Sequence, residues 1–376
     1  MRRVFPVLIC VTLVWCPTAG RAVIPHVLHK AGEILVSIEQ RRDELRRLGV
    51  KQRSAYCGAG PVEWTPEPVV QTVGSERQPG QDLAMSLMRA SALVLAFDDE
   101  AARRAIVDHL DLWARNDALL ERETEHRARV FYNLDRTLMP MIVAFSMVRG
   151  AGDVDPEQSA NIEAWLGELV DMRRGPNRFS RPARTSSRNN HRYLADSVTM
   201  AWGALTGDRA MFDKGIERFH IALGQARDDG SLPLETARGK LALHYQRHAV
   251  GSLINIAEMA RLQGVDLYSA KSERGLTIHD LVTFLANAID TPGLLDGYAP
   301  REQDLGFLER RGHGRHYMAW FEAYAARFGD RSSARRLGQI LIEHGHDGAP
   351  MIDDYFGSVT TCLFRPLTDI APPPPT

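Results

Sequence analysis

The sequence predicts an all-α protein in which helical hairpins stack around one core and close into an α/α barrel or toroid. Apolar residues recur at helical spacing through most of the 376-residue chain. Short segments rich in helix-stopping and helix-starting residues separate these stretches. No long alternation of apolar and polar residues indicates a large sheet. Helices joined in pairs by short turns pack around a single core, which gives the predicted fold class.

Residues 1–22 are predicted to form an export signal. Arg2 and Arg3 precede the uncharged, mostly apolar segment 4–15, which is too short to span a bilayer. Gly20-Arg21-Ala22 then supplies small residues at the positions that a signal peptidase recognises. We therefore expect cleavage near Ala22, a periplasmic or secreted protein, and no stable membrane insertion after cleavage. An uncleaved anchor and a lipoprotein are the alternatives.

The expected helices follow in order along the remaining chain. Residues 27–48 form the first, and the Pro- and Gly-rich segment 50–78 is an irregular connection. Turn residues such as Gly150 and Gly207-Asp208 mark helix ends. The later amphipathic segments are 79–97, 99–114, 131–148, 155–173, 190–205, 209–227, 240–263, 276–290, 313–328 and 332–344.

A single domain is predicted from residue 23 to residue 370, a length that can bury a large core. Residues 357–364 are expected to form a short strand. Residues 371–376 are expected to form a flexible, Pro-rich tail.

Charge and cysteine content limit the possible partners and cross-links. The formal net charge is −1, so no global field attracts nucleic acid. Two of the four cysteines lie in the export signal. Cys57 and Cys362 remain, and they form either one bridge in an oxidising compartment or two free thiols.

The first segment with candidate functional residues is an arginine-rich run. Seven arginines and no acidic residue occur from Arg173 to Arg192. The run leads into Asn189-Asn190-His191, where a helix is expected to begin. A solvated loop is the alternative for the arginines, and helix capping is the alternative for the asparagines.

The second segment extends from Asp229 to His248. Asp229-Gly230 and Pro233 indicate turns, and a helix is expected to begin near Gly239. If Arg238 lies on that helix, it shares a face with Tyr245 at a separation of about 10 Å. Such a pair could straddle one sugar unit. The alternative is a surface arginine and a half-buried core tyrosine.

Together the two segments resemble the paired motifs of the polysaccharide lyase family that includes the bacterial alginate lyases. Asn189-Asn190-His191-x-Tyr193 resembles the first motif. Asp229-Gly-x-Leu-Pro-x-Glu235, followed by Arg238 and Leu243-His244-Tyr245, resembles the second. Their order and spacing also agree. The resemblance implies an α/α barrel or toroid, lyase activity without a cofactor, and an acidic polysaccharide as substrate.

The resemblance also implies catalytic roles for Asn190, His191, Arg238 and Tyr245. Removal of the C5 proton of a uronate places further negative charge on its carboxylate. Arg238, Asn190 and His191 could stabilise that charge by donating hydrogen bonds. Tyr245 is the candidate proton-transfer group, poised by the nearby cation. His191 is the rival base.

Further residues are expected to bind substrate. This set comprises His244, Arg188, Arg192, Tyr132, Asn133 and Arg136. Asn133 alternatively begins a helix, and His244 alternatively holds the site together. His313, His316 and Tyr317 form a predicted helical cluster that could line a cleft or bind metal, although a structural role is favoured. No metal is expected.

Four positions depart from the family pattern: Arg192, Leu194, Ala237 and Arg247, which replace the usual Ser, Trp, basic residue and Asn. These departures leave the chemistry in place but argue against strict mannuronate specificity. The resemblance makes alginate, or polymannuronate, the first candidate substrate, with glucuronan or another acidic exopolysaccharide next. A glycoside hydrolase is a second possibility, but it needs two suitably placed carboxylates. A non-catalytic glycan-binding protein is the third. Glu235, Glu309 and Glu322 are available as carboxylates, and no pair is marked by its surroundings.

Overall fold

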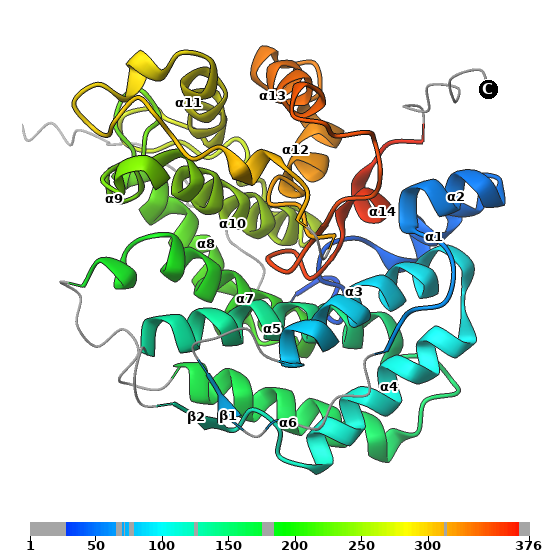
Figure 1. Cartoon of the computed structure of the whole chain (residues 1–376). Coiled ribbons are helices and arrows are strands. Elements are labelled where there is room, and N and C mark those ends of the chain that lie inside the picture. Colours follow the sequence, from blue (N-terminus) through cyan, green and yellow to red (C-terminus); the bar gives the residue numbers. More distant parts are fainter. Residues whose placement is uncertain are drawn as a thin grey trace, which may run out of the picture.

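The computed structural model describes residues 28–64, 70, 72–74, 79–123, 127–174, 184–311 and 314–367. Helices dominate these residues, and the strands are two residues long (Figure 1). The helices are α1 Ile38–Arg46, α2 Val50–Cys57, α3 Pro79–Phe97, α4 Glu100–Arg115, α5 Arg127–Val148, α6 Pro156–Arg174, α7 Asn190–Thr206, α8 Arg209–Gln225, α9 Pro233–Thr236, α10 Ala242–Leu262, α11 Ile278–Asp290, α12 Trp320–Phe328, α13 Ser332–Glu343 and α14 Thr360–Phe364.

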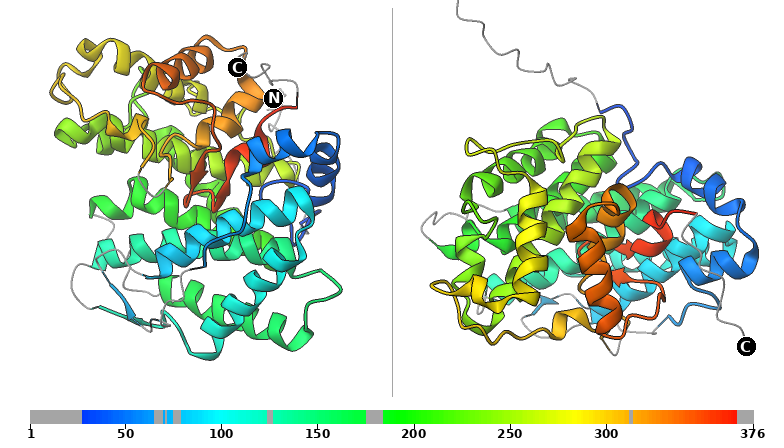
Figure 2. Two further views of the ribbon diagram at one scale, coloured as in Figure 1. Left: turned by 45° about the vertical axis from the view of Figure 1, so that its right-hand side comes forward. Right: turned by 90° about the horizontal axis from the view of Figure 1, so that it is seen from above.

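Alternate long helices form an inner and an outer layer. In the inner layer α3 packs on α5, α5 on α7, α7 on α10, and α10 on α12. The outer helices α4, α8 and α11 each follow an inner helix along the chain and pack against it. Figures 1 and 2 show this succession of hairpins from two sides and from above. The arrangement confirms the predicted all-α fold of stacked helical hairpins.

Local sequence sets the ends of several helices. Asp99 and Asp208 cap α4 and α8 by accepting hydrogen bonds from the backbone N–H groups of Ala102 and Met211. Gly207 ends α7 in the left-handed region, with φ of 80°. These residues make the turn between α7 and α8 only two residues long. A short turn of this kind brings the two helices into an antiparallel hairpin.

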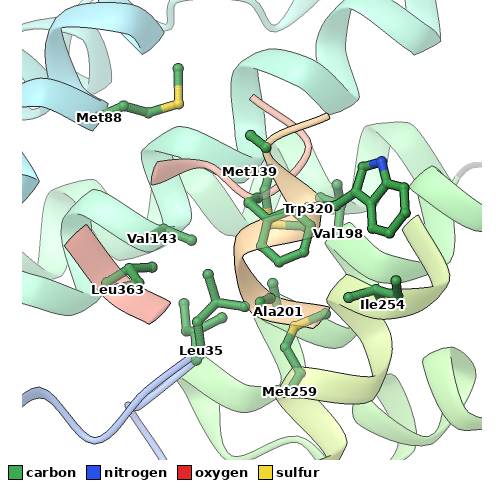
Figure 3. Close-up of a cluster of buried hydrophobic side chains, with 14 of the residues drawn as sticks. Leu35, Met88, Met139, Val143, Val198, Ala201, Ile254, Met259, Trp320 and Leu363 are labelled. Carbon is green, nitrogen blue, oxygen red and sulfur yellow. The ribbon is translucent and has the colours of Figure 1, made fainter. Parts of the chain in front are cut away.

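One continuous apolar core joins the inner helices. Figure 3 shows Met139 of α5, Val198 of α7, Ile254 of α10 and Trp320 of α12 meeting in it. A Cβ atom on Gly251 would lie 3.0 Å from the Trp320 ring, so this glycine lets α10 and α12 approach closely. The core therefore fixes the inner layer, whose ends hold the polar side chains described below.

The N-terminal prediction is partly wrong. Of the described residues 28–48 only Ile38–Arg46 is helical, and a second helix, Val50–Cys57, lies in the segment expected to be irregular. Gly32 has φ of 93°, which interrupts helical geometry before α1. Cys57, at the end of α2, is bonded to Cys362 of α14. This disulfide settles the choice between a bridge and free thiols, and it ties α2 to a helix 305 residues away.

The C-terminal prediction also needs correction. The helix expected over 313–328 begins at Trp320, because Arg315 instead pairs by a β-bridge with Ile352. Within 357–364 only Ser358–Val359 is extended, as β4, and it pairs antiparallel with β3, Ile352–Asp353. The other strand pair joins β1, Thr72–Val73, to β2, Glu121–Arg122, in parallel. Figure 1 shows the β3–β4 segment, in red, returning beside α3.

None of the helices in the described ranges combines the length and apolar character needed to cross a bilayer. The predicted export signal and its cleavage position lie outside the described residues, as does the Pro-rich tail.

Candidate active site

The first turn of α7 places Asn190 and His191. Asn189 is the cap, and its side chain accepts a hydrogen bond from the His191 N–H at 3.2 Å. Asn190 is the first helical residue and is buried, with its side-chain Nδ2 atom 3.0 Å from Nδ1 of His248 on α10. Only Asn189 therefore has the capping role that the sequence left open for both asparagines.

Glu235 of α9 links this turn to the second motif. Its Oε1 atom accepts the Asn190 backbone N–H at 2.8 Å, and its side chain is fully buried. Burial raises the pKa of Glu235 to about 8, although the Asn190 N–H and Arg238 both favour the charged form. The carboxyl is thus mainly protonated at neutral pH.

Arg238 lies directly against Tyr245. The Arg238 guanidinium carbon is 3.8 Å from the centroid of the Tyr245 ring, in cation–π contact. The predicted separation of about 10 Å along one helix is wrong, because α10 begins only at Ala242. Arg238 precedes a short 3₁₀ turn at Gly239–Leu241, in which Gly239 has φ of 58°. This turn folds the arginine back over the phenol.

His244 is surrounded by aromatic rings and cations. Its ring centroid lies 5.4 Å from that of Tyr245 and 5.4 Å from that of Tyr317. Its Nε2 atom is 3.3 Å from Nη2 of Arg247. Burial, and then the charge of Arg247 with that of other arginines, lowers the pKa of His244 to about 3. His244 is therefore a neutral polar group at neutral pH.

Tyr132 of α5 connects α7 and α10 to residues 314–367, called the C-terminal segment below. Its ring centroid is 5.1 Å from that of His191 and 5.8 Å from that of His248. Its hydroxyl is 2.5 Å from the hydroxyl of Tyr355, which follows β3. Tyr355 in turn packs against His248, with centroids 4.3 Å apart. The predicted residues Tyr132, Asn190 and His191 thus belong to one cluster.

A buried ionic network lies behind this cluster. Arg136 contacts Asp354 at 2.7 Å, and Arg315 contacts Asp353 at 2.9 Å and Asp354 at 2.6 Å. Burial raises the pKa of Asp353 to about 6 although Arg315 opposes the shift. Burial would also raise the pKa of Asp354, but Arg136 and Arg315 hold it below its usual value. The network fixes the C-terminal segment against α5.

The arginine run is divided between structural and exposed positions. Arg173 is buried 3.4 Å from Asp135, and Arg192 pairs with Asp196 at 2.8 Å. Both guanidinium groups thus have acidic partners within the fold. Arg184 and Arg188 are exposed. The run's remaining side chains lie outside the described residues.

Asn133 and His316 occupy structural surroundings. Asn133 lies within α5 and not at its start; it is buried and donates to the Gly74 carbonyl at 3.1 Å. His316 is buried and packs against His346 with ring centroids 5.5 Å apart. His313 lies outside the described residues. Across the described ranges, no group of three or more His, Cys, Asp or Glu side chains is placed to hold a metal ion.

The glutamates considered for hydrolysis belong to different surroundings. Glu235 contacts α7, whereas Glu322 accepts a hydrogen bond from Thr361 at 2.9 Å and pairs with Arg365. Glu309 is exposed. The contacts of these side chains give no sign of two carboxylates facing one site.

Sequence reasoning missed Tyr355, Arg315 and the acidic pair Asp353-Asp354. The sequence marks Arg247 only as a departure from the family motif, and Tyr317 only as part of a predicted helical cluster. The signal for the missed group was Asp353-Asp354-Tyr355 itself, which places two acids and a phenol together in an otherwise apolar segment.

Known proteins resemble this chain over a large part of its sequence. Residues 83–294 match the model of a family described as alginate lyase. A polysaccharide lyase of Stenotrophomonas maltophilia is 34% identical over 190 residues, which cover 50% of this chain and 56% of that protein. An alginate lyase of Azotobacter chroococcum is 29% identical over 262 residues, covering 68% of this chain and 65% of that protein. The chain thus aligns with less than two thirds of the length of these relatives.

Solved structures match over a greater length. A tyrosine-to-phenylalanine variant of alginate lyase A1-III complexed with a tetrasaccharide has a TM-score of 0.77 and 25% identity, covering 93% of this chain and 100% of that chain. Alginate lyase A1-III from Sphingomonas species A1 has a TM-score of 0.75 and 25% identity, covering 90% and 97%. These similarities confirm the α/α toroid.

Proposed function

The chain belongs to the alginate lyase family, and we propose that it is a polysaccharide lyase that cleaves alginate or a related polyuronate by β-elimination. The observation that supports this best is the contact between Arg238 and Tyr245, at 3.8 Å from guanidinium carbon to ring centroid. It places a permanent cation beside a phenol that can exchange a proton.

Charge stabilisation is assigned to Arg238, Asn190 and His191. Loss of the C5 proton spreads negative charge onto the uronate carboxylate, and preorganised donors stabilise that charge. Asn190 is held from both sides, by Glu235 at its backbone and by His248 at its side chain. Because these partners are buried, the amide needs little rearrangement in the transition state.

Proton transfer is assigned to Tyr245. As phenolate, its oxygen takes the C5 proton, and the electron pair of the C5–H bond forms the C4–C5 double bond. The C4–O4 bond breaks, and the departing O4 takes the proton from the Tyr245 hydroxyl. The tyrosine is regenerated and no external oxidant or reductant is consumed. His191 is the alternative base. Its ring lies in the same cluster, edge-on to the ring of Tyr132.

The substrate assignment rests on the relatives and on the charge of the site. The Azotobacter relative and the solved structures are described as alginate lyases, and one of these structures is complexed with a tetrasaccharide. Arg238 and Arg247 bring positive charge to the site, which suits an acidic glycan, whereas Arg136 and Arg315 are paired with Asp353 and Asp354. We include Arg188, which is exposed near α7, as a substrate contact. Export to the periplasm or the medium, where such polymers occur, is part of the proposal.

Product analysis tests the proposal. The purified chain is incubated with polymannuronate, polyguluronate, alginate and glucuronan, and unsaturated uronate ends are followed by ultraviolet absorbance. Absorbance should rise with at least one polymer, and the rise should be lost in Tyr245→Phe. Saturated reducing ends without absorbance would assign the chain to hydrolysis. Glycan binding without cleavage would make it a binding protein.

A further inference from the structure

Arg247 is a buried cation whose contacts are unusual. It lies on α10 one turn beyond His244 and is fully buried. Its Nη1 atom is 3.3 Å from the Tyr317 carbonyl oxygen, and its Nη2 atom is 3.3 Å from His244 Nε2. Within the described ranges no carboxylate lies within ion-pair distance of it. A buried guanidinium therefore uses an imidazole nitrogen as one of its two polar partners.

This contact determines where the imidazole proton lies. A guanidinium has donors only and remains protonated at any physiological pH. The nitrogen facing it must therefore offer a lone pair, so Nε2 of His244 is unprotonated. In the neutral ring the one proton then lies on Nδ1.

We propose that Arg247 is a positioning residue that holds His244 as the neutral tautomer with its proton on Nδ1, so that His244 donates a hydrogen bond to the acidic sugar and does not act as a base. This inference rests on the proposed lyase function, because it assigns the donor to that substrate. The sequence leaves two roles open for His244, substrate contact and structural support, and the proposal assigns substrate contact.

The charges around His244 favour the neutral state. Arg247 faces it from α10, and Arg311 and Arg315 lie around Tyr317, with guanidinium carbons 4.8 and 4.4 Å from that ring's centroid. Arg238 lies over the neighbouring Tyr245. Burial and these four cations lower the pKa of His244 to about 3. The groups facing it are thus cations and phenols, together with the neutral His248.

The second nitrogen of His244, Nδ1, is the donor that the proposal assigns to the substrate. The described residues provide no hydrogen-bond partner for Nδ1 of His244, and the ring is only partly buried. The ring stands edge-on between Tyr245 and Tyr317, at interplanar angles of 83° and 81°. A donor in this position, beside the proposed proton-transfer residue, suits a carboxylate or hydroxyl group of a uronate.

Histidine-selective ¹⁵N NMR of the full chain tests the tautomer without reference to activity. His244 signals, assigned by their loss in His244→Asn, should show unprotonated Nε2 and protonated Nδ1 from about pH 5 to 8. In Arg247→Asn, which introduces the residue common at this position in the family, the signals should move towards a tautomer mixture and titrate at higher pH. Arg311→Gln is the matched control, because it removes a nearby charge but not the hydrogen bond. It should raise the pKa of His244 and leave the tautomer unchanged.

Kinetics test the donor role. His244→Ala should lower kcat/KM by about 10-fold or more, the effect of losing one hydrogen bond to a charged group. His244→Asn, which keeps a donor near the Nδ1 position, should retain most of the activity lost in His244→Ala.

The outcomes separate this inference from the lyase assignment. A wild-type spectrum with protonated Nε2, or with an imidazolium at pH 6, would overturn the tautomer assignment whatever the activity. Equal losses in His244→Asn and His244→Ala would overturn the donor role. Absence of lyase activity, with the NMR result as expected, would remove the proposed function and the donor role while leaving the Arg247–His244 arrangement intact.

Discussion

Replacing Glu235 with glutamine should make the protein more stable at high pH. The carboxyl is fully buried, and burial raises its pKa from 4.5 to about 8. Glutamine has nearly the same shape and still accepts the Asn190 N–H through its amide oxygen, a bond of 2.8 Å in the native protein. The substitution therefore removes the titration and keeps the contact.

The direction of this pH dependence follows from the protons that the folded and unfolded states bind. Between pH 4.5 and 8 the folded protein holds a proton on Glu235 that the unfolded chain has released. Stability therefore falls as the pH rises through this window, at up to about 1.4 kcal/mol per pH unit. A difference of about 3.5 units, 8 minus 4.5, gives at most about 5 kcal/mol. The cost is absent below pH 4.5 and complete above pH 8.

Denaturant unfolding at about pH 5, 7 and 9 measures the effect. The free energy of unfolding of Glu235→Gln minus that of the wild type should increase steadily with pH. Glu309→Gln, at an exposed position, is the control and should show no such trend. A constant difference between Glu235→Gln and wild type over this range would refute the reasoning, because it would mean that Glu235 is already ionised in the folded protein.

Further changes test the site and the fold. Tyr245→Phe should lower kcat by at least about 10²-fold with little change in KM, and near-normal turnover would make His191 the base. Arg238→Leu should lower kcat and raise KM together, since it removes a charge that complements the substrate carboxylate; an unchanged KM would argue against substrate contact. Replacing Cys57 and Cys362 with serine should lower the free energy of unfolding by about 2–5 kcal/mol in denaturant titrations, and unchanged stability would contradict this. Chelators should leave lyase activity unchanged, and loss reversed by one divalent ion would show a metal requirement.

The long helices could be predicted from sequence because their signals are local. The segment 79–97 was predicted with the bounds that α3 has, and α4 begins and ends one residue later than predicted. Apolar periodicity and an acidic cap such as Asp99 suffice there. The two-residue strands and the short helix α14 could not be predicted in this way. Their geometry depends on distant partners, such as the disulfide between Cys57 and Cys362.

The relation between Arg238 and Tyr245 shows how a motif can be recognised while its geometry is misjudged. Both residues belong to the sequence motif, but the predicted separation assumes that one helix contains them. Gly239, with φ of 58°, instead begins a 3₁₀ turn that precedes α10. A glycine allows this conformation but does not require it, so sequence alone left both geometries open.

The site also depends on residues outside the segment that matches the family model. Residues 83–294 contain both motifs, whereas Arg315, Tyr317 and Tyr355 lie beyond them. Tyr355 nevertheless meets Tyr132 across 223 residues of sequence, at 2.5 Å between hydroxyl oxygens. Tyr317 packs against His244, as Tyr245 does, with ring centroids 5.4 Å apart. The motifs therefore supply the proposed reacting groups, while the C-terminal segment supplies part of their electrostatic surroundings. Differences in uronate preference between relatives should accordingly be sought in residues 311–355 as well as in the motifs.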